Sequence, residues 1–248
     1  MTKQEKIAYA KKSIAASIGR GVEIFGQDKN VFIESGDDDG FFTLIHFDGN
    51  AVIIADKAIL GWCIENFADV SGNEIVKGAH YAALTAKLRE HGKELRDDYK
   101  DISHMRLEDV GNMETKEYPE FEFEIYEKDR LSELEELYEK EIFSQALDKV
   151  WRNEVFAIVA HKDGDIVAAV SCCDAYKEAF RQINVDTLAE HRGRGLATHL
   201  VMKISQEIES RGHVPLYTTW ETNTASMHVA KVTGFSPVWL WCYGLDIE

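Results

Sequence analysis

The segment VDTLAEHRGRGLATHLVMKI, residues 185–204, constrains the fold of this chain more than any other. A strand-like stretch runs into Arg-Gly-Arg-Gly, and a helical pattern follows with a leucine or isoleucine at every fourth position. The first turn of a helix leaves main-chain N–H groups without partners, and glycines let a ligand approach them. Together with the helix dipole and two arginines, this arrangement predicts an anion-binding site.

Two well-known phosphate motifs do not describe this segment. A P-loop requires Gly-Lys-Ser/Thr, which does not follow, and His199 breaks the spacing G-x-G-x-x-G of dinucleotide-binding folds. A glycine pair taken alone is better explained as a turn that lets a strand enter a helix. The order of the elements around the segment therefore matters for its interpretation.

From residue 119 onward the pattern predicts the order β-α-β-β-β-α-β-α-β. Apolar alternation and helical spacing place these elements, in chain order, at 121–126, 129–151, 155–173 (a hairpin turning at Asp163-Gly164), 181–188, 196–211, 214–220, 226–234 and 237–245. This order predicts an α/β fold with a mixed sheet.

The N-terminal part predicts a smaller mixed α/β domain. It has helices at 3–20 and 73–97 and strands at 30–35, 41–47 and 50–56, with a hairpin at Asp-Gly-Asn. The run GDDDG at 36–40 resembles a calcium loop, but the EF-hand register places His46 at the glutamate position, which favours a solvated turn. The polar stretch 108–123 is the expected boundary, giving domains at 1–112 and 118–248.

Composition limits the partners of the protein. Its 248 residues hold 44 acidic and 28 basic side chains, a net charge of −16, which disfavours nucleic acid and fits cationic ligands or simply a solvated surface. No apolar run reaches the length of a membrane span or a signal sequence, so we expect a cytoplasmic protein without a membrane partner. The four cysteines show no metal or redox spacing and are expected to be reduced thiols; they are Cys63, Cys172, Cys173 and Cys242.

Two motifs in this second half resemble those of the GCN5-related N-acetyltransferase (GNAT) superfamily. VDTLAEHRGRGLATHLV is similar to its acetyl-CoA motif Q/R-x-x-G-x-G/A, with Glu190 in the slot usually held by Gln or Arg. NTASMHVAKVTGF resembles the family's N-x-x-A-x-x-x-Y-x-x-x-G-F segment. The combination TWETNTASMHVAKVTGF with a long N-terminal extension more loosely resembles the branch containing the zwittermicin A resistance acetyltransferase.

The resemblance implies a GNAT fold and acetyl-CoA as cosubstrate, with no metal. Its pantetheine arm would pair with a strand edge and its pyrophosphate would lie on the arginine–glycine loop. A cap of the following helix is the alternative role for the asparagine of the second motif. The implied cofactor-binding residues are Val185, Asp186, Thr187, Arg192, Gly193, Arg194, Gly195, Leu196, Ala197, Asn223 and Ser226.

The catalytic residues are less clearly indicated, because Ala230 stands where the family usually has a tyrosine that protonates the thiolate. Glu221 is the favoured base or amine ligand, with a surface or capping role as the alternative. Tyr217, His228 and Tyr243 are weaker candidates. The pair Cys172-Cys173 is not expected to be nucleophilic, because no histidine lies close enough in the sequence to activate either thiol.

The sequence thus predicts an acetyl-CoA-dependent N-acetyltransferase that acts on a primary amine of a small, cationic molecule by direct attack on the thioester. A catalytically weak acyl-CoA-binding or sensing module with the same fold is the alternative, motivated by Ala230.

Overall fold

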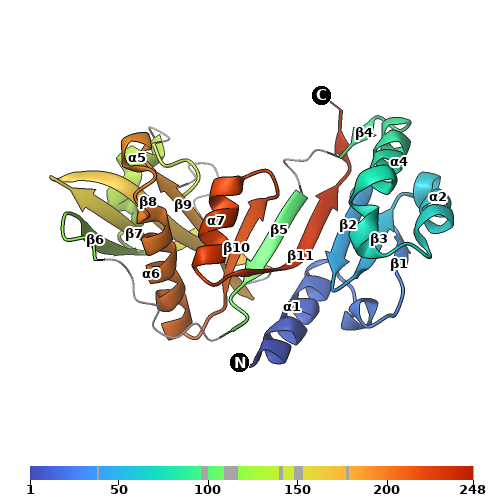
Figure 1. Ribbon diagram of the computed structural model, residues 1–248, viewed down its shortest axis with the longest axis horizontal. Helices are drawn as coiled ribbons and strands as arrows, with labels where there is room; N and C mark the ends of the chain where they lie inside the picture. The colour runs from blue at the N-terminus through green and yellow to red at the C-terminus, as the bar shows by residue number, and fades with distance from the viewer. Residues whose placement is uncertain are drawn as a thin grey trace. The chain divides into compact units, whose positions relative to one another are not determined.

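The structure is a computed structural model that describes residues 1–37, 39–95, 100–108, 117–139, 142–147, 153–176 and 179–247 (Figure 1). Its internal contacts divide the chain into two compact units. Unit 1 comprises Met1–His104, Thr219–Met227 and Pro237–Glu248, and unit 2 comprises Met105–Thr218 and His228–Ser236. The boundary expected between 112 and 118 stays a prediction, since residues 109–116 lie outside the described ranges.

Unit 1 contains a sheet in the order β1-β3-β2-β11-β5. β1 runs parallel to β3, whereas β2 is antiparallel to both β3 and β11. The elements of this unit are α1 (Lys3–Ser17), a 3-10 turn (Val22–Phe25), β1 (Val31–Glu34), β2 (Phe42–Phe47), β3 (Asn50–Ala55), α2 (Lys57–Phe67), α3 (Gly72–Ile75), α4 (Gly78–Arg89), β4 (Lys93–Glu94), β5 (Lys100–Met105), β11 (Ser236–Tyr243) and β12 (Leu245–Asp246).

Several predictions for the N-terminal part are confirmed. The first helix and the three strands lie where the pattern places them, and Asp48 and Gly49 form the tight hairpin between β2 and β3 with φ of 54° and 90°. In the GDDDG turn, Asp39 accepts a hydrogen bond from the Gly36 N–H at 2.8 Å and pairs with Arg20 at 2.9 Å. This turn is therefore tied to the end of α1 by a salt bridge.

The single helix predicted at 73–97 is wrong in extent. The chain is extended at Lys77, so that α3 and α4 are separate, and α4 ends at Arg89. The residues that follow form β4, which pairs with β12, and this pairing requires an extended backbone that a longer helix would prevent. α2 and β5 were not predicted at all.

The two faces of the unit 1 sheet are covered differently. Alternate side chains of β2, β3 and β11 pack with α2, α3 and α4 in one apolar cluster. On the opposite face, Phe47 stacks on Trp239 with ring centroids 6.1 Å apart, and Lys11 of α1 lies 5.1 Å from the Phe47 ring. The second face is therefore aromatic, and α1 covers part of it.

Unit 2 contains the strands β10-β9-β8-β7-β6 in that order, antiparallel except for the parallel pair β9 and β10. Its elements are β6 (Glu122–Glu127), a 3-10 turn (Leu131–Leu134), α5 (Glu135–Glu139), β7 (Glu154–Lys162), β8 (Asp165–Ala175), β9 (Phe180–Thr187), a 3-10 turn (Ala189–His191), α6 (Leu196–Ser210), β10 (Pro215–Trp220) and α7 (Thr224–Val232). The last residues of β10 and the first of α7 belong to unit 1. The predicted order β-α-β-β-β-α-β-α-β is confirmed.

The helix predicted at 129–151 is much shorter than expected. α5 ends at Glu139, and residues 142–147 form turns. The buried side chains of this segment, Leu134, Tyr138, Phe143, Ala146 and Leu147, do not follow one helical period. The chain therefore changes direction to pack them against the sheet. Residues 140–141 and 148–152 lie outside the described ranges.

Alternation along β7 and β8 explains how unit 2 is layered. Ile158 and Val170 pack with α6 and α7 in one cluster, whereas Val159 and Ala169 pack with the segment that contains α5. Successive strand residues point to opposite faces, so α6 and the α5 segment cover different sides of the sheet (Figure 1).

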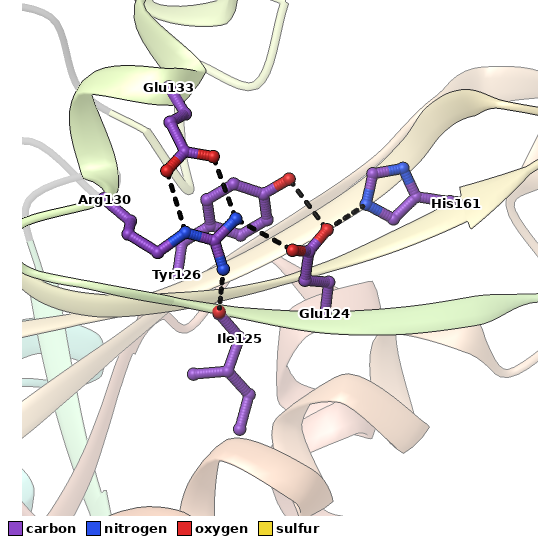
Figure 2. Close-up of polar contacts among 6 residues, drawn as sticks. All are labelled: Glu124, Ile125, Tyr126, Arg130, Glu133 and His161. Carbon is purple, nitrogen blue, oxygen red and sulfur yellow. Dashed lines mark hydrogen bonds and ion pairs between the residues drawn. The ribbon is translucent and has the colours of Figure 1, made fainter.

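A polar network holds β6 to its neighbours (Figure 2). Arg130 donates two hydrogen bonds to Glu133, both 2.8 Å long, and a third to Glu124 at 2.9 Å. Glu124 also accepts from the Tyr126 hydroxyl at 2.9 Å and lies 3.5 Å from His161 Nε2 on β7. Arg130 chiefly, and Tyr126 next, lower the pKa of Glu124 below its usual value.

Within the described stretches, no helix combines the length and apolarity needed to cross a membrane. In the same stretches, no group of three His, Cys, Asp or Glu side chains is placed to hold a metal ion.

Candidate functional site

An open strand edge forms one side of the candidate site in unit 2. The parallel pairing of β10 with β9 covers Pro215↔Arg181 and Leu216↔Gln182. Beyond these pairs, within the described stretch 179–247, residues 183–187 of β9 have β8 as their partner on one side. On the other side of β9, the edge around Val185 therefore has no strand partner within this stretch.

Side chains already contact part of this edge. The Thr187 N–H donates to Asp186 Oδ1 at 2.8 Å, and Arg192 Nε donates to the Thr187 carbonyl at 2.8 Å. Thr187 therefore turns its main-chain groups away from β8. Because side-chain and hydrogen-bond directions alternate along a strand, the main-chain groups of Val185 face the same edge.

The loop after β9 has two glycines in the left-handed region. Gly193 has φ of 74° and Gly195 has φ of 85°. Residues other than glycine rarely adopt this backbone conformation. Gly195 is the N-cap of α6 and supplies no side-chain hydrogen bond to the first turn. A Cβ at Gly193 would meet no atom within 4 Å, so the space above the loop is open.

Tyr118 contacts the loop at two of its residues, and the sequence did not predict these contacts. Its hydroxyl donates to the Arg194 carbonyl at 3.0 Å. A Cβ at Gly195 would lie 2.7 Å from the same hydroxyl. Gly195 is therefore required both by its backbone conformation and by the tyrosine packed beneath it.

The two arginines of the loop differ in their surroundings. Both side chains are exposed, but the Arg192 guanidinium lies 3.5 Å from Asp186, whereas Arg194 has no ion-pair partner in the described part of the chain. Glu190, in the slot where the family has Gln or Arg, is exposed at the start of the loop. Arg194 is thus the loop cation that is ready to meet an anion.

A buried histidine, His199, lies in the first turn of α6. Its ring packs against Tyr118 and Phe123, with centroids 4.9 and 4.6 Å apart, and neither ring nitrogen has a hydrogen-bond partner in the described residues. Burial, with a smaller effect of Lys203, lowers the pKa of His199 to about 4. The histidine is therefore neutral at pH 7, and no cation lies directly below the loop at this position.

The second motif caps α7. The Ser226 N–H donates to Asn223 Oδ1 at 3.0 Å, and the Met227 N–H donates to the Asn223 carbonyl at 2.9 Å. Both Asn223 and Ser226 belong to unit 1. The capping role weighed from the sequence is therefore present, and a contact of Asn223 with the pantetheine stays a prediction.

The candidate catalytic residues lie in different surroundings. In unit 1, Glu221 is exposed in the turn after β10, and Tyr243 stacks on Trp241 with ring centroids 5.9 Å apart. In unit 2, Tyr217 is buried against Phe235, and His228 is exposed on α7. Glu221 is accessible to a ligand, whereas Tyr217 is part of the core.

Ala230, in the usual tyrosine slot, is 1% exposed and belongs to the apolar cluster beneath α6.

Cys172 is also buried, and burial raises the pKa of its thiol to about 12. Burial also raises the pKa of the neighbouring Cys173. Neither thiol is therefore set up as a nucleophile, as the sequence indicated.

Comparison with known proteins identifies a matching protein family. The family model named GNAT acetyltransferase matches residues 64–241, which is more than half of the chain. None of the curated proteins matches the chain.

Three solved structures illustrate the likeness. A GNAT-family acetyltransferase from Novosphingobium aromaticivorans is 18% identical with a TM-score of 0.46, covering 63% of this chain and 69% of its own. One from Colwellia psychrerythraea is 15% identical with a TM-score of 0.45, covering 68% and 62%. A GCN5-related N-acetyltransferase-like protein from Streptococcus suis is 13% identical with a TM-score of 0.48, covering 95% and 98%.

Proposed function

The chain belongs to the GNAT acetyltransferase family, and we propose that it transfers an acetyl group from acetyl-CoA to a primary amine of a small cationic molecule. As a member of this family it is an N-acetyltransferase of the EC 2.3.1 type. The single observation that carries the proposal is the uncapped N-terminus of α6, preceded by two left-handed glycines and the exposed Arg194.

The residues around this loop fit the phosphates of acetyl-CoA. A helix N-terminus contributes about 0.3–1 kcal/mol toward an anion, and each hydrogen bond to a charged group adds about 1.5–3 kcal/mol. We assign the pyrophosphate to the loop at 192–197, through the N–H groups from Gly193 onward, with Arg194 as the added cation. The β9 edge at 185–187 would hold the pantetheine arm, with Asn223 and Ser226 as further contacts.

Acetyl-CoA supplies the acetyl group as a thioester, so the acceptor amine must arrive in its neutral form. An alkylamine of pKa about 10.4 is neutral in about one molecule in 2,500 at pH 7, which costs about 4.6 kcal/mol. We assign the removal of this proton to Glu221, directly or through water, because its carboxylate is exposed and follows the end of β10.

Protonation of the departing thiolate requires a residue other than the usual tyrosine. Ala230 has no proton to give and lies in the core. Among the alternatives, His228 and Tyr243 are more accessible than the buried Tyr217, and water or the product ammonium can also supply the proton. The same alanine supports the second candidate function, a catalytically weak module that binds or senses acyl-CoA.

We further propose that residues 1–112 wall part of the acceptor site, as in a member of the branch containing the zwittermicin A resistance acetyltransferase. The surplus of 44 acidic over 28 basic residues supports a cationic acceptor. We also propose a cytoplasmic location, in which the four cysteines would stay reduced.

The test is release of the free CoA thiol from acetyl-CoA in the presence of a panel of small amines, with mass spectrometry of the products. An acetyltransferase gives a thiol signal that depends on the amine and an amine product heavier by one acetyl group. If acetyl-CoA binds in calorimetry but no amine is acetylated, the binding or sensing function is correct instead.

A further inference from the structure

Asp101, on β5 in unit 1, is a carboxylate for which the described chain provides no cation. The side chain is half-buried, and its one partner is the indole N–H of Trp220, which donates to it. No ion pair involves it within the described ranges. Burial raises the pKa of Asp101, and the hydrogen bond from Trp220 offsets part of that rise. A carboxylate in such surroundings is stabilised when a cation binds beside it.

The face of the sheet on which Asp101 lies follows from its neighbour. Lys100 Nζ lies 3.6 Å from the centre of the Tyr81 ring on α4, so Lys100 points to the side covered by the helices α2 to α4. Successive residues of a strand point to opposite faces, so Asp101 points to the other side.

The same alternation on β11 places two aromatic rings on the face of Asp101. Leu240 and Cys242 pack with the cluster formed by α2 to α4. Trp241 and Tyr243 therefore point to the opposite face, where they stack on each other. β5 lies next to β11 in the sheet. The face that carries Asp101 is thus rich in aromatic rings.

Asp101 is itself partly exposed, and its partner Trp220 is exposed as well. The residue is 41% exposed although it is large and apolar, and it directly precedes the exposed Glu221. Its N–H is used by Asp101, which leaves the face of the indole for a ligand. A carboxylate beside an exposed indole is the combination that binds alkylammonium ions, by charge and by cation–π attraction.

We propose that Asp101 and Trp220 form a subsite that anchors a non-reacting ammonium group of the acceptor. The inference rests on the proposed function and narrows the acceptor to molecules with at least two amino groups. Anchoring suits Asp101 better than proton removal, because a half-buried carboxylate raises the pKa of an amine beside it and keeps that amine protonated. The reacting amine is left to the more exposed Glu221.

The subsite is tested by titrating the protein, without acetyl-CoA, with n-hexylamine and with 1-hexanol at pH 7 and following tryptophan fluorescence. The amine is expected to bind at least tenfold more tightly than the alcohol. Asp101→Asn keeps the shape and the hydrogen bond from Trp220 but loses the charge, and should weaken amine binding at least tenfold.

Two further variants complete this test. Asp69→Asn removes a carboxylate of unit 1 that is 89% exposed and should leave binding unchanged. Trp220→Phe should remove the fluorescence response and weaken binding. Equal binding of amine and alcohol, or unchanged binding by a folded Asp101→Asn variant, would overturn the proposal.

An activity measurement separates this proposal from the proposed function. The ratio of kcat/KM for 1,6-diaminohexane over n-hexylamine should exceed ten, and Asp101→Asn should bring it close to one. If n-hexylamine binds through Asp101 but no amine is acetylated, the subsite stands and the acetyltransferase assignment fails. If both amines are acetylated equally well, the assignment stands and the anchoring role is wrong.

Discussion

The arginine–glycine loop of unit 2 and the Asp101–Trp220 pair of unit 1 are built in opposite ways. The loop uses main-chain N–H groups, fixed by two left-handed glycines within a few residues of one another. The pair joins side chains that are 119 positions apart in the sequence and meet because two strands lie in one unit. Sites made of main chain leave a local motif, whereas sites made of side chains depend on topology. The following predictions test this contrast, starting with the largest expected effect.

The largest effect is expected from Glu221→Gln, on the acceptor side. Turnover should fall about 10²–10⁴-fold, as is typical when a general base is lost, while acetyl-CoA affinity stays the same. Activity of the parent protein should rise toward about pH 8–9 because the amine must lose its proton, and the variant should lose that rise. Glu65→Gln, an exposed glutamate on α2, is the matched control. Near-normal turnover with the parent pH profile would reduce Glu221 to a surface residue.

The next effect concerns the buried histidine under the loop. His199 has a pKa of about 4 in the folded chain and about 6.5 in the unfolded chain, so the unfolded state binds more protons between these values. Stability should therefore fall by about 3 kcal/mol as the pH drops from 6.5 to 4. His199→Phe should remove this part of the slope in urea unfolding measured across that range. An identical slope in the variant would show that other groups cause the acid sensitivity.

A third prediction compares the two loop glycines with a glycine that has the same backbone conformation at the other end of α6. Gly195→Val should weaken acetyl-CoA binding tenfold or more, since it strains the backbone and collides with Tyr118. Gly193→Val should also weaken binding, because its side chain enters the open space above the loop. Gly212→Val, at the other end of α6, has the same left-handed strain with no atom within 4 Å and is the control. Calorimetry showing parent affinity for both loop variants would contradict the assignment.

The smallest effect compares the two arginines. Arg194→Ala should weaken acetyl-CoA binding about two- to fivefold, because an ion pair between exposed groups contributes about 0.5–1 kcal/mol. Arg192→Ala should do less, since that side chain is bonded to Thr187 and Asp186. The difference should shrink at high salt. A larger loss from Arg192→Ala would mean that its guanidinium leaves β9 when the cofactor binds.

The sequence predicted the strands of unit 2 and the helices α6 and α7 well because their apolar residues follow simple periods, which the buried residues of the α5 segment do not. It missed β5 because this strand lacks an apolar pattern, although it is an interior strand of the sheet. Its polar residues are Lys100, Asp101, Ser103 and His104. α2 was missed although Ile59, Cys63 and Phe67 are buried at a spacing of four, with Asp56 as its cap. In that case the signal was present in the sequence.

For the candidate site, the glycines were predictable and the support beneath them was not. Gly193 and Gly195 stand in a recognisable spacing, whereas Tyr118 reaches Arg194 from 76 positions away. Likewise, nothing near Trp220 in the sequence indicates Asp101. Contacts of this kind become visible when the strands are placed side by side.

The account's central claim, that main-chain groups of the loop hold acetyl-CoA, is tested most directly by hydrogen exchange of the intact chain with and without acetyl-CoA. We predict that amides of residues 193–198 become protected on binding, with little change at the exposed start of α1. Binding confirmed by calorimetry without protection of these amides would contradict the claim.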